Sequence, residues 1–187
     1  AVMAAIGQAT KHGVIIKSGE ILETMGKVDI MAFDKTGTLT RGQLAVQSIL
    51  AVDTDYSETD ILQLAASAEA KSEHPIGKAI VSHAIEQDLE ILDTTSFTMS
   101  VGKGIIAVIK GRELYCGNER FLEEHNIIVS ESIQQAINVY RSEGKVSVII
   151  ANNEYIIGII TLSDTMRNDA INIISAISSL DMTTVLL

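Results

Sequence analysis

The chain has 187 residues, which is long enough for one large or two small hydrophobic cores. Its 14 Lys and Arg residues against 24 Asp and Glu residues give a formal net charge of -10, which argues against nucleic acid as a partner. The single cysteine, Cys116, excludes an internal disulfide framework and a metal site built on two cysteines, and no apolar run approaches the roughly 18 residues of a membrane span.

The first part of the chain predicts a helix end followed by one strand. Residues 1–16 begin with small apolar side chains and then become polar, which predicts the end of a helix and a connector. The apolar run at 28–33 predicts a buried strand. Apolar alternation over 42–52 predicts an extended connector.

The rest of the chain predicts helices and strands in the alternating order of α/β proteins. Helices are predicted at about 58–70, from Pro75 onward, at about 118–125 and at about 131–143, and strands at 97–101, 104–109, 113–116, 146–151 and 155–162. The segment 164–180 has helical periodicity. The apolar run 183–187 predicts a final strand, cut off before its loop.

Local signals predict where three of these helices begin. Ser57 and Asp60 have the spacing of a capping box before an apolar periodic segment. Pro75, the only proline, suits the first turn of a helix, and Asn118 is a good N-cap residue. The start of a helix is therefore a sufficient structural explanation for each of these residues, without any role in binding or catalysis.

The order of the elements predicts one domain inserted into another. The outer pieces, 17–42 and 161–187, are expected to form an incomplete, parallel, Rossmann-like sheet. The inner block, 43–160, with its own helices and antiparallel hairpins, is expected to form a two-layer α+β module. The predicted fold class is therefore α/β with an inserted α+β domain.

The most informative motif follows the first predicted strand, and it is Asp34-Lys35-Thr36-Gly37-Thr38-Leu39-Thr40. An aspartate just beyond a buried strand lies where open α/β sheets place their ligand chemistry. The glycine and the hydroxyl residues behind it suit a phosphoryl group, and the carboxylate can be a phosphate-accepting nucleophile. An ordinary turn would explain a lone Asp-x-Thr, but the full run resembles the phosphorylation motif of the P-type ATPases.

A second group of candidate residues lies in the inner block. Ser72-Glu73-His74-Pro75 stands between two predicted helices, shortly after Glu69. Gly102-Lys103-Gly104-Ile105 places two glycines at the start of a strand, where a ligand can approach the backbone. Gly117-Asn118 opens the next helix. Taken singly, a histidine without chemistry, a plain glycine turn and a helix cap explain these motifs equally well.

In this order and beside the phosphorylation motif, the pieces resemble the nucleotide-binding domain of the heavy-metal, CPx-type P-type ATPases. The resemblance covers essentially the whole chain. It implies a haloacid-dehalogenase-type phosphorylation domain with an inserted nucleotide-binding domain. The residues that it assigns to ATP binding are Glu69, His74, Gly102, Gly104, Ile105, Gly117 and Asn118.

The same resemblance implies the roles of the phosphorylation motif. Asp34 would accept the phosphoryl group and bind Mg²⁺, and the backbone carbonyl of Thr36 would be the second protein ligand. Lys35 and the hydroxyls of Thr36 and Thr38 would hold the transferring group. Asp164 matches the aspartate near the hinge of the family. Its structural alternative is to cap the helix predicted over 166–180.

The resemblance also implies a larger protein. Such a pump transports a heavy-metal cation, of the copper or the zinc and cadmium type, through membrane helices, and its actuator domain is a further partner. The chain would lie at the cytosolic face, with residues 1–16 leaving a membrane helix. Later aspartates and a lysine of the family would follow Leu187, so this piece alone is expected to bind ATP without turnover.

Two other function classes fit parts of the sequence. A soluble phosphatase or phosphomutase of the haloacid dehalogenase superfamily often has a second aspartate two residues after the nucleophile, where this chain has Thr36. A regulatory nucleotide-binding module would leave the phosphorylation motif unexplained. Both are therefore less favoured than the catalytic part of a pump.

Overall fold

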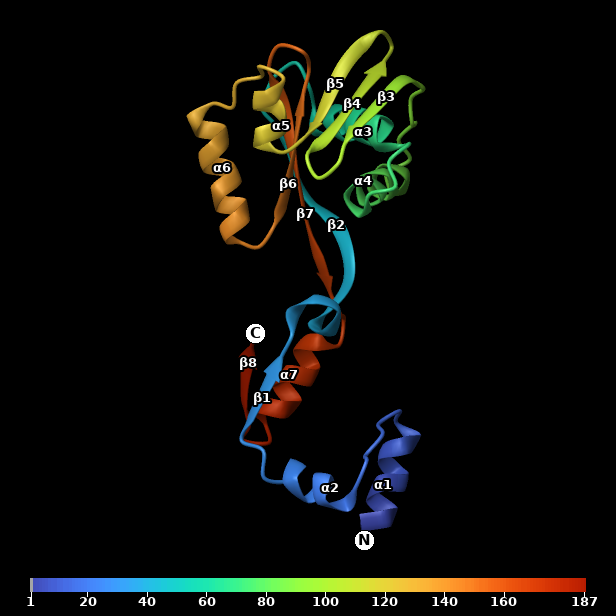
Figure 1. Cartoon of the computed structure of the whole chain (residues 1–187), viewed down its shortest axis with the longest axis vertical. Helices are drawn as coiled ribbons and strands as arrows, with labels where there is room; N and C mark the ends of the chain where they lie inside the picture. Colours follow the sequence, from blue (N-terminus) through green and yellow to red (C-terminus); the bar gives the residue numbers. More distant parts are fainter. Residues whose placement is uncertain (1) are drawn as a thin grey trace. The chain divides into compact units, whose positions relative to one another are not determined.

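The computed structural model describes residues 2–187, so that Ala1, the first residue of the predicted membrane-proximal segment, lies outside the described residues. The chain divides into two compact units (Figure 1). One joins Ala1–Arg41 to Met166–Leu187, and the other is Gly42–Thr165. The chain returns to the first unit after residue 165, whereas the sequence suggested a boundary after residue 160.

Within residues 2–187, the first unit contains a short parallel sheet, three α-helices and a π-helical turn at Lys35–Leu39. The strands β1 (Ile30–Phe33) and β8 (Thr183–Leu186) pair in parallel, which confirms the parallel arrangement expected of the outer pieces. The helices are α1 (Val2–Lys11), α2 (Gly19–Met25) and α7 (Ala170–Ser178). No helix within residues 2–187 has both the length and the apolar character that crossing a membrane requires.

Two of these helices differ from the sequence prediction. The helix α2 was not predicted, although Ser18 is its N-cap and accepts a hydrogen bond from the backbone N–H of Ile21. The helix α7 begins only at Ala170, because residues up to Met166 continue a strand. The prediction of a helix from about residue 164 is therefore wrong at its start.

The second unit is built on a six-stranded sheet in the order β2-β7-β6-β5-β4-β3. Neighbours from β3 to β7 pair antiparallel, and the 146–151 and 155–162 segments form the predicted hairpin. The strands are β2 (Thr40–Ala51), β3 (Thr94–Ser100), β4 (Gly104–Ile109), β5 (Arg112–Gly117), β6 (Val146–Ala151) and β7 (Ile156–Met166).

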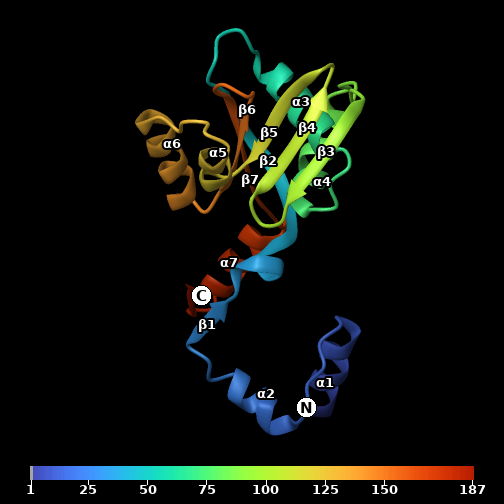
Figure 2. The same ribbon diagram turned by 45° about the horizontal axis from the view of Figure 1, so that its top comes forward.

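Helices cover both faces of this sheet. They are α3 (Glu58–Glu69) and α4 (Pro75–Glu86) on one face, and α5 (Glu119–Glu124) and α6 (Glu131–Ser142) on the other (Figure 2). Along β6, Val148 and Ile150 belong to the core with α3 and α4, whereas Ile149 and Ala151 belong to the core with α5 and α6. The predicted two-layer module is therefore wrong, because consecutive apolar residues of β6 are buried on opposite faces.

The helix starts follow the capping signals in the sequence. Ser57 and Asp60 form a full capping box at the start of α3, and Pro75 occupies the first turn of α4. Asn118 is the N-cap of α5, where its side chain accepts a hydrogen bond from the backbone N–H of Phe121 at 2.9 Å. These predictions are confirmed, and they fix the loops that carry the candidate site.

Candidate functional sites

A cavity of about 230 Å³ lies in the second unit, where β5 ends and β6 continues. The pairing between these strands covers Tyr115–Gly117 and Ile149–Ala151, so residues 146–148 of β6 lie along the cavity instead. The cavity brings together all of the residues expected to bind the nucleotide, namely Glu69, His74, Gly102, Gly104, Ile105, Gly117 and Asn118.

Glu69 is a buried carboxyl group in the wall of this cavity. It is the last residue of α3 and only 6% exposed. Burial raises the pKa of the Glu69 carboxyl above its ordinary value, and a hydrogen bond from Ser72 and the charge of His74 oppose this only in part. The site therefore contains a carboxyl group that keeps its proton to a higher pH than an exposed glutamate.

Gly77, in the first turn of α4, has a role that the sequence did not suggest. A Cβ atom at this position would lie 2.5 Å from Glu69 Oε2 and 2.9 Å from Ser72 Oγ. Only glycine therefore lets α4 pack directly against the buried carboxyl group. The sequence pattern had indicated only an apolar face for this helix.

His74 is the N-cap of α4, and this role orients its ring. Its Nδ1 atom accepts a hydrogen bond from the backbone N–H of Ile76 at 3.2 Å. Because Nδ1 is the acceptor, the neutral ring carries its proton on Nε2. His74 is exposed, so this N–H is available to a ligand in the cavity.

The three predicted glycines have two different structural roles. Gly102 has a φ of +72°, and a Cβ atom added there would meet no heavy atom within 4 Å, so its backbone is open to a ligand. Gly104 and Gly117 face each other across β4 and β5, and a Cβ on either would lie within 2.6 Å of the Phe121 ring. These two glycines therefore make room for Phe121 as well as lining the cavity.

Asn118 ties the glycine turn to the start of α5. Its backbone N–H donates to the carbonyl of Lys103 at 3.0 Å, and its side-chain Nδ2 donates to the carbonyl of Gly102 at 3.4 Å. Ser147 lies on the β6 side of the cavity, and its buried hydroxyl has no hydrogen-bond partner within residues 2–187. An unpaired buried hydroxyl in a cavity wall is a candidate contact for a polar ligand.

The phosphorylation motif lies in the first unit, in a tight turn after β1. The turn spans Lys35–Leu39, and Gly37 has a φ of +78°, which favours glycine. Thr40 is buried, and its hydroxyl accepts a hydrogen bond from Gly37 N–H and donates to the carbonyl of Lys35, both at 3.1 Å. The turn leaves the predicted catalytic residues exposed: Asp34, Lys35, Thr36 and Thr38.

Arg167, which is far from this turn in the sequence, donates hydrogen bonds to its backbone, a role that the sequence did not predict. Its guanidinium donates to the carbonyls of Thr40 at 3.2 Å and Gly37 at 3.1 Å, and its backbone N–H donates to Leu39 at 2.9 Å. A short turn is thereby braced by three long-range hydrogen bonds. The only sequence signal for this role is the position of Arg167 shortly after Asp164.

Asp164 lies in β7, in the second unit, and does not cap a helix. Its Oδ1 atom accepts a hydrogen bond from the backbone N–H of Gln43 at 2.9 Å, and the neighbouring Thr165 hydroxyl donates to the carbonyl of Gln43 at 3.2 Å. The capping alternative is therefore wrong, because α7 follows Asp169 instead. Asp164 fastens β7 to β2 near the point where both strands pass between the units.

Comparison with known proteins shows the family of the chain. The haloacid dehalogenase-like hydrolase family matches residues 28–187, which is most of the chain. The chain belongs to this family. The match begins just before β1 and includes the phosphorylation motif as well as the six-stranded unit.

The chain is also similar over its whole length to heavy-metal P-type ATPases, which confirms the resemblance. It is 36% identical over 187 residues to a copper-exporting P-type ATPase of Staphylococcus epidermidis, and 31% identical over 182 residues to a probable copper-exporting P-type ATPase V of Mycobacterium tuberculosis. These matches cover 100% and 97% of the chain, but only 23% and 24% of the two relatives.

Solved structures show the same fold. A zinc-transporting PIB-type ATPase in the E2.Pi state matches 100% of the chain and 30% of its own length, with a TM-score of 0.88 and 34% identity. The catalytic domain of the CPx-ATPase CopB-B matches 97% of the chain and 60% of its own length, with a TM-score of 0.66 and 25% identity. The α/β fold with an inserted domain is thus that of P-type ATPase phosphorylation and nucleotide-binding domains.

Proposed function

We propose that this chain is the ATP-binding and phosphorylated part of a P-type ATPase that transports a heavy-metal cation. The observation that carries the proposal is the single cavity lined by all seven expected nucleotide-binding residues, in a chain similar throughout to such ATPases. The relatives include both copper-exporting and zinc-transporting proteins, so either kind of cation suits the proposal.

In this proposal the cavity of the second unit binds the adenine nucleotide. His74 Nε2–H offers a donor to the nitrogen atoms of the base, and the Glu69 carboxyl offers hydrogen-bonding oxygens to its polar edge, while Ile76 and Met99 supply apolar wall. The open backbone at Gly102 and the turn held by Asn118 lie beside them, where the ribose and phosphates would pass. Such a mixture of apolar wall and few polar groups is typical of small-molecule sites.

The exposed Asp34 carboxylate would accept the γ-phosphoryl group of ATP. One carboxylate oxygen forms a bond to the γ-phosphorus while the bond from that phosphorus to the β,γ-bridging oxygen breaks, and ADP leaves. The hard oxygens of the Asp34 side chain and the Thr36 carbonyl fit Mg²⁺, which, when bound, would offset the charge on the phosphoryl group. Lys35 and the Thr38 hydroxyl stand in the same exposed turn to hold that group.

The remaining parts of the proposal concern the whole pump. The chain would lie at the cytosolic face of a membrane, the unit of residues 17–41 and 166–187 would belong to the phosphorylation domain, and the unit of residues 42–165 would be the nucleotide-binding domain. The actuator domain and the metal-binding membrane helices of the same pump would be its partners. The chain by itself is expected to bind ATP without turnover, which a steady-state phosphate-release assay would test.

Titration with ATP, followed by nuclear magnetic resonance, tests the nucleotide assignment. Backbone amides at Glu69, His74, Gly102 and Asn118 should shift together, and His74→Gln should weaken binding. His83→Gln is the matched control, since His83 lies on the same helix but lines a different cavity. Shifts confined to other parts of the second unit, or equal affinities for the two variants, would contradict the proposal.

A further inference from the structure

The cavity proposed to bind ATP has a single full positive charge in its described wall. Lys103 is the only Lys or Arg among the residues that line it, and Glu69 is the acidic residue there. The chain carries a net charge of -10. A polyphosphate ligand therefore approaches a protein that repels it overall, and a cation at the cavity mouth matters for its binding.

Lys103 is attached to a fixed piece of backbone. Its N–H donates to the carbonyl of Ser100 at 3.0 Å, and its carbonyl accepts from the N–H of Asn118 at 3.0 Å. The preceding residue, Gly102, has open space beside it. Rotation of the Lys103 side chain can therefore move its ammonium group while these backbone hydrogen bonds stay in place.

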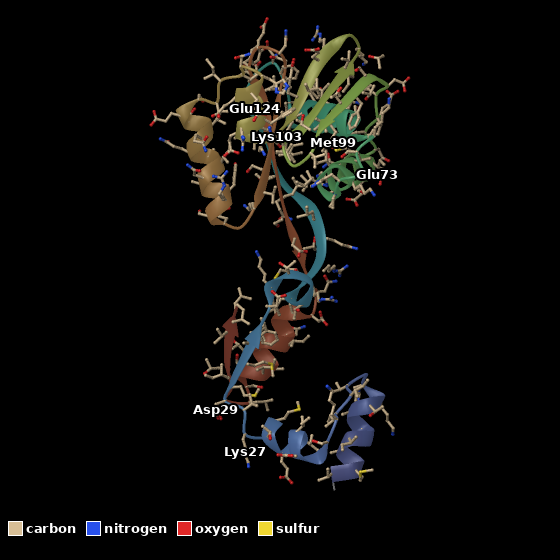
Figure 3. All side chains as sticks on the ribbon, in the orientation of Figure 1. Lys27, Asp29, Glu73, Met99, Lys103 and Glu124 are labelled. Carbon is tan, nitrogen blue, oxygen red and sulfur yellow. The ribbon has the colours of Figure 1, made fainter. Side chains whose placement is uncertain are left out.

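That ammonium is held by a carboxylate of α5. Lys103 Nζ lies 2.8 and 2.7 Å from the two oxygens of Glu124 (Figure 3). The two side chains are 36% and 40% exposed, so water screens the ion pair and it is weak. Arg120 also contacts Glu124, with its Nε atom at 3.2 Å, so Glu124 keeps a cationic partner if Lys103 leaves.

We propose that Lys103 recognises the phosphate groups of the bound nucleotide and that Glu124 competes with those phosphates for it. This inference rests on the proposed nucleotide-binding function of the cavity. In the free chain, Glu124 holds Lys103. When a nucleoside triphosphate enters, its phosphate oxygens replace the Glu124 carboxylate as partners of Lys103, and Glu124 remains paired with Arg120. The Lys103–Glu124 pair thus lowers the affinity for nucleotide while it prevents a free cation at the cavity mouth.

Isothermal titration of the full chain with adenosine, AMP and ATP, without Mg²⁺, tests the competition. Glu124→Gln should bind ATP about two- to fivefold more tightly than the parent chain, because an exposed ion pair of this kind contributes less than tenfold in binding terms. Lys103→Met should bind ATP several times more weakly. Adenosine should bind all three chains equally, because it carries no phosphate.

The double variant Lys103→Met with Glu124→Gln separates competition from a general charge effect. Competition predicts that Glu124→Gln has no effect on ATP binding once Lys103 is absent. Glu123→Gln removes the same charge one residue away on α5 and should leave the affinity close to that of the parent chain. Lys78→Met removes an ion-paired lysine that lines a different cavity, and it should likewise have little effect.

The possible failures differ from one another. If neither adenosine nor ATP binds the parent chain, the nucleotide assignment of the cavity is wrong and this inference falls with it. If ATP binds but Glu124→Gln leaves its affinity unchanged, the nucleotide assignment stands and the competition is refuted. An equal gain in affinity from Glu123→Gln, or a gain that persists in the double variant, also refutes it.

Discussion

Arg167 donates a hydrogen bond from its guanidinium to the carbonyl oxygen of Gly37 at 3.1 Å, across 130 positions of the sequence. Gly37 is the centre of the phosphorylation motif, and its φ of +78° is a conformation that glycine adopts without strain. The same guanidinium also reaches the carbonyl of Thr40. The residue that follows β7 therefore sets the shape of the turn that presents Asp34.

We expect Arg167→Met to loosen the phosphorylation turn without unfolding the first unit. The variant removes two charge-assisted hydrogen bonds but keeps the backbone bond from Arg167 N–H to Leu39. Amide hydrogen exchange at residues 37–40 should become about tenfold faster, because the free energy of local opening falls by roughly 1–2 kcal/mol. Arg41→Met, which removes an exposed arginine beside the turn, is the control. Equal protection in Arg167→Met and the parent chain would show that the brace has no effect.

In the proposed pump, Asp34→Asn should abolish the acid-stable phospho-enzyme expected to form from radiolabelled ATP. An amide has no anionic oxygen to attack the γ-phosphorus, so no aspartyl phosphate forms. Asp29→Asn makes the same change of charge just before β1 (Figure 3) and should leave phosphorylation unchanged. Normal labelling of the Asp34 variant would place the phosphate acceptor elsewhere.

Much of the second unit was predictable because its signals are local. The capping box at Ser57, the proline at the start of α4 and the cap at Asn118 each depend on residues within four positions. The hairpin between β6 and β7 has a short connection and apolar runs on both sides. The seven residues expected to bind nucleotide came from a family resemblance, and the structure places them around one cavity.

What the sequence did not reveal depends on contacts between distant residues. Aspartate is a residue type that often caps helices, yet the hydrogen bond from Gln43 N–H to Asp164, 121 positions away, keeps Asp164 in a strand. Gly104 and Gly117 suggested ligand access, but their contact with Phe121 appears only once β4 and β5 are paired. The bonds from Arg167 to the phosphorylation turn and from Lys103 to Glu124 likewise have no local signature.

Gly104→Ala should destabilise the second unit more than Gly102→Ala does. A Cβ at Gly104 would lie 2.5 Å from the Cys116 carbonyl and 2.6 Å from the Phe121 ring, whereas Gly102 has space but an unfavourable φ of +72°. We expect costs of about 2–3 and about 1 kcal/mol, measured by urea unfolding. Adding Phe121→Leu to Gly104→Ala should cost less than the sum of the single variants, because the two residues collide. Fully additive costs would exclude this contact as the reason for glycine.

The buried carboxyl of Glu69 should make the stability of the second unit depend on pH. Burial raises the folded-state pKa of Glu69 above its ordinary value of 4.5, at which it ionises in the unfolded chain. Between these two values the folded state binds more protons than the unfolded state, so the free energy of unfolding falls as pH rises. The stabilisation of the fold by protonated Glu69 is complete below the unfolded-state pKa and is lost once the pH has passed the folded-state pKa. The loss is about 1.4 kcal/mol for each unit by which these two pKa values differ.

Glu69→Gln tests this dependence, because glutamine stays neutral at every pH. Its stability relative to the parent chain, measured by urea unfolding between pH 4 and pH 8, should rise as pH increases above the ordinary glutamate value and then level off. Glu73→Gln is the control, and the pH dependence of its stability relative to the parent chain should have the opposite sign. The reason is that the hydrogen bond and charge of Lys78 lower the pKa of the exposed Glu73 carboxyl. A stability difference between Glu69→Gln and the parent chain that is constant over this range would mean that Glu69 ionises as freely in the folded chain as in the unfolded one.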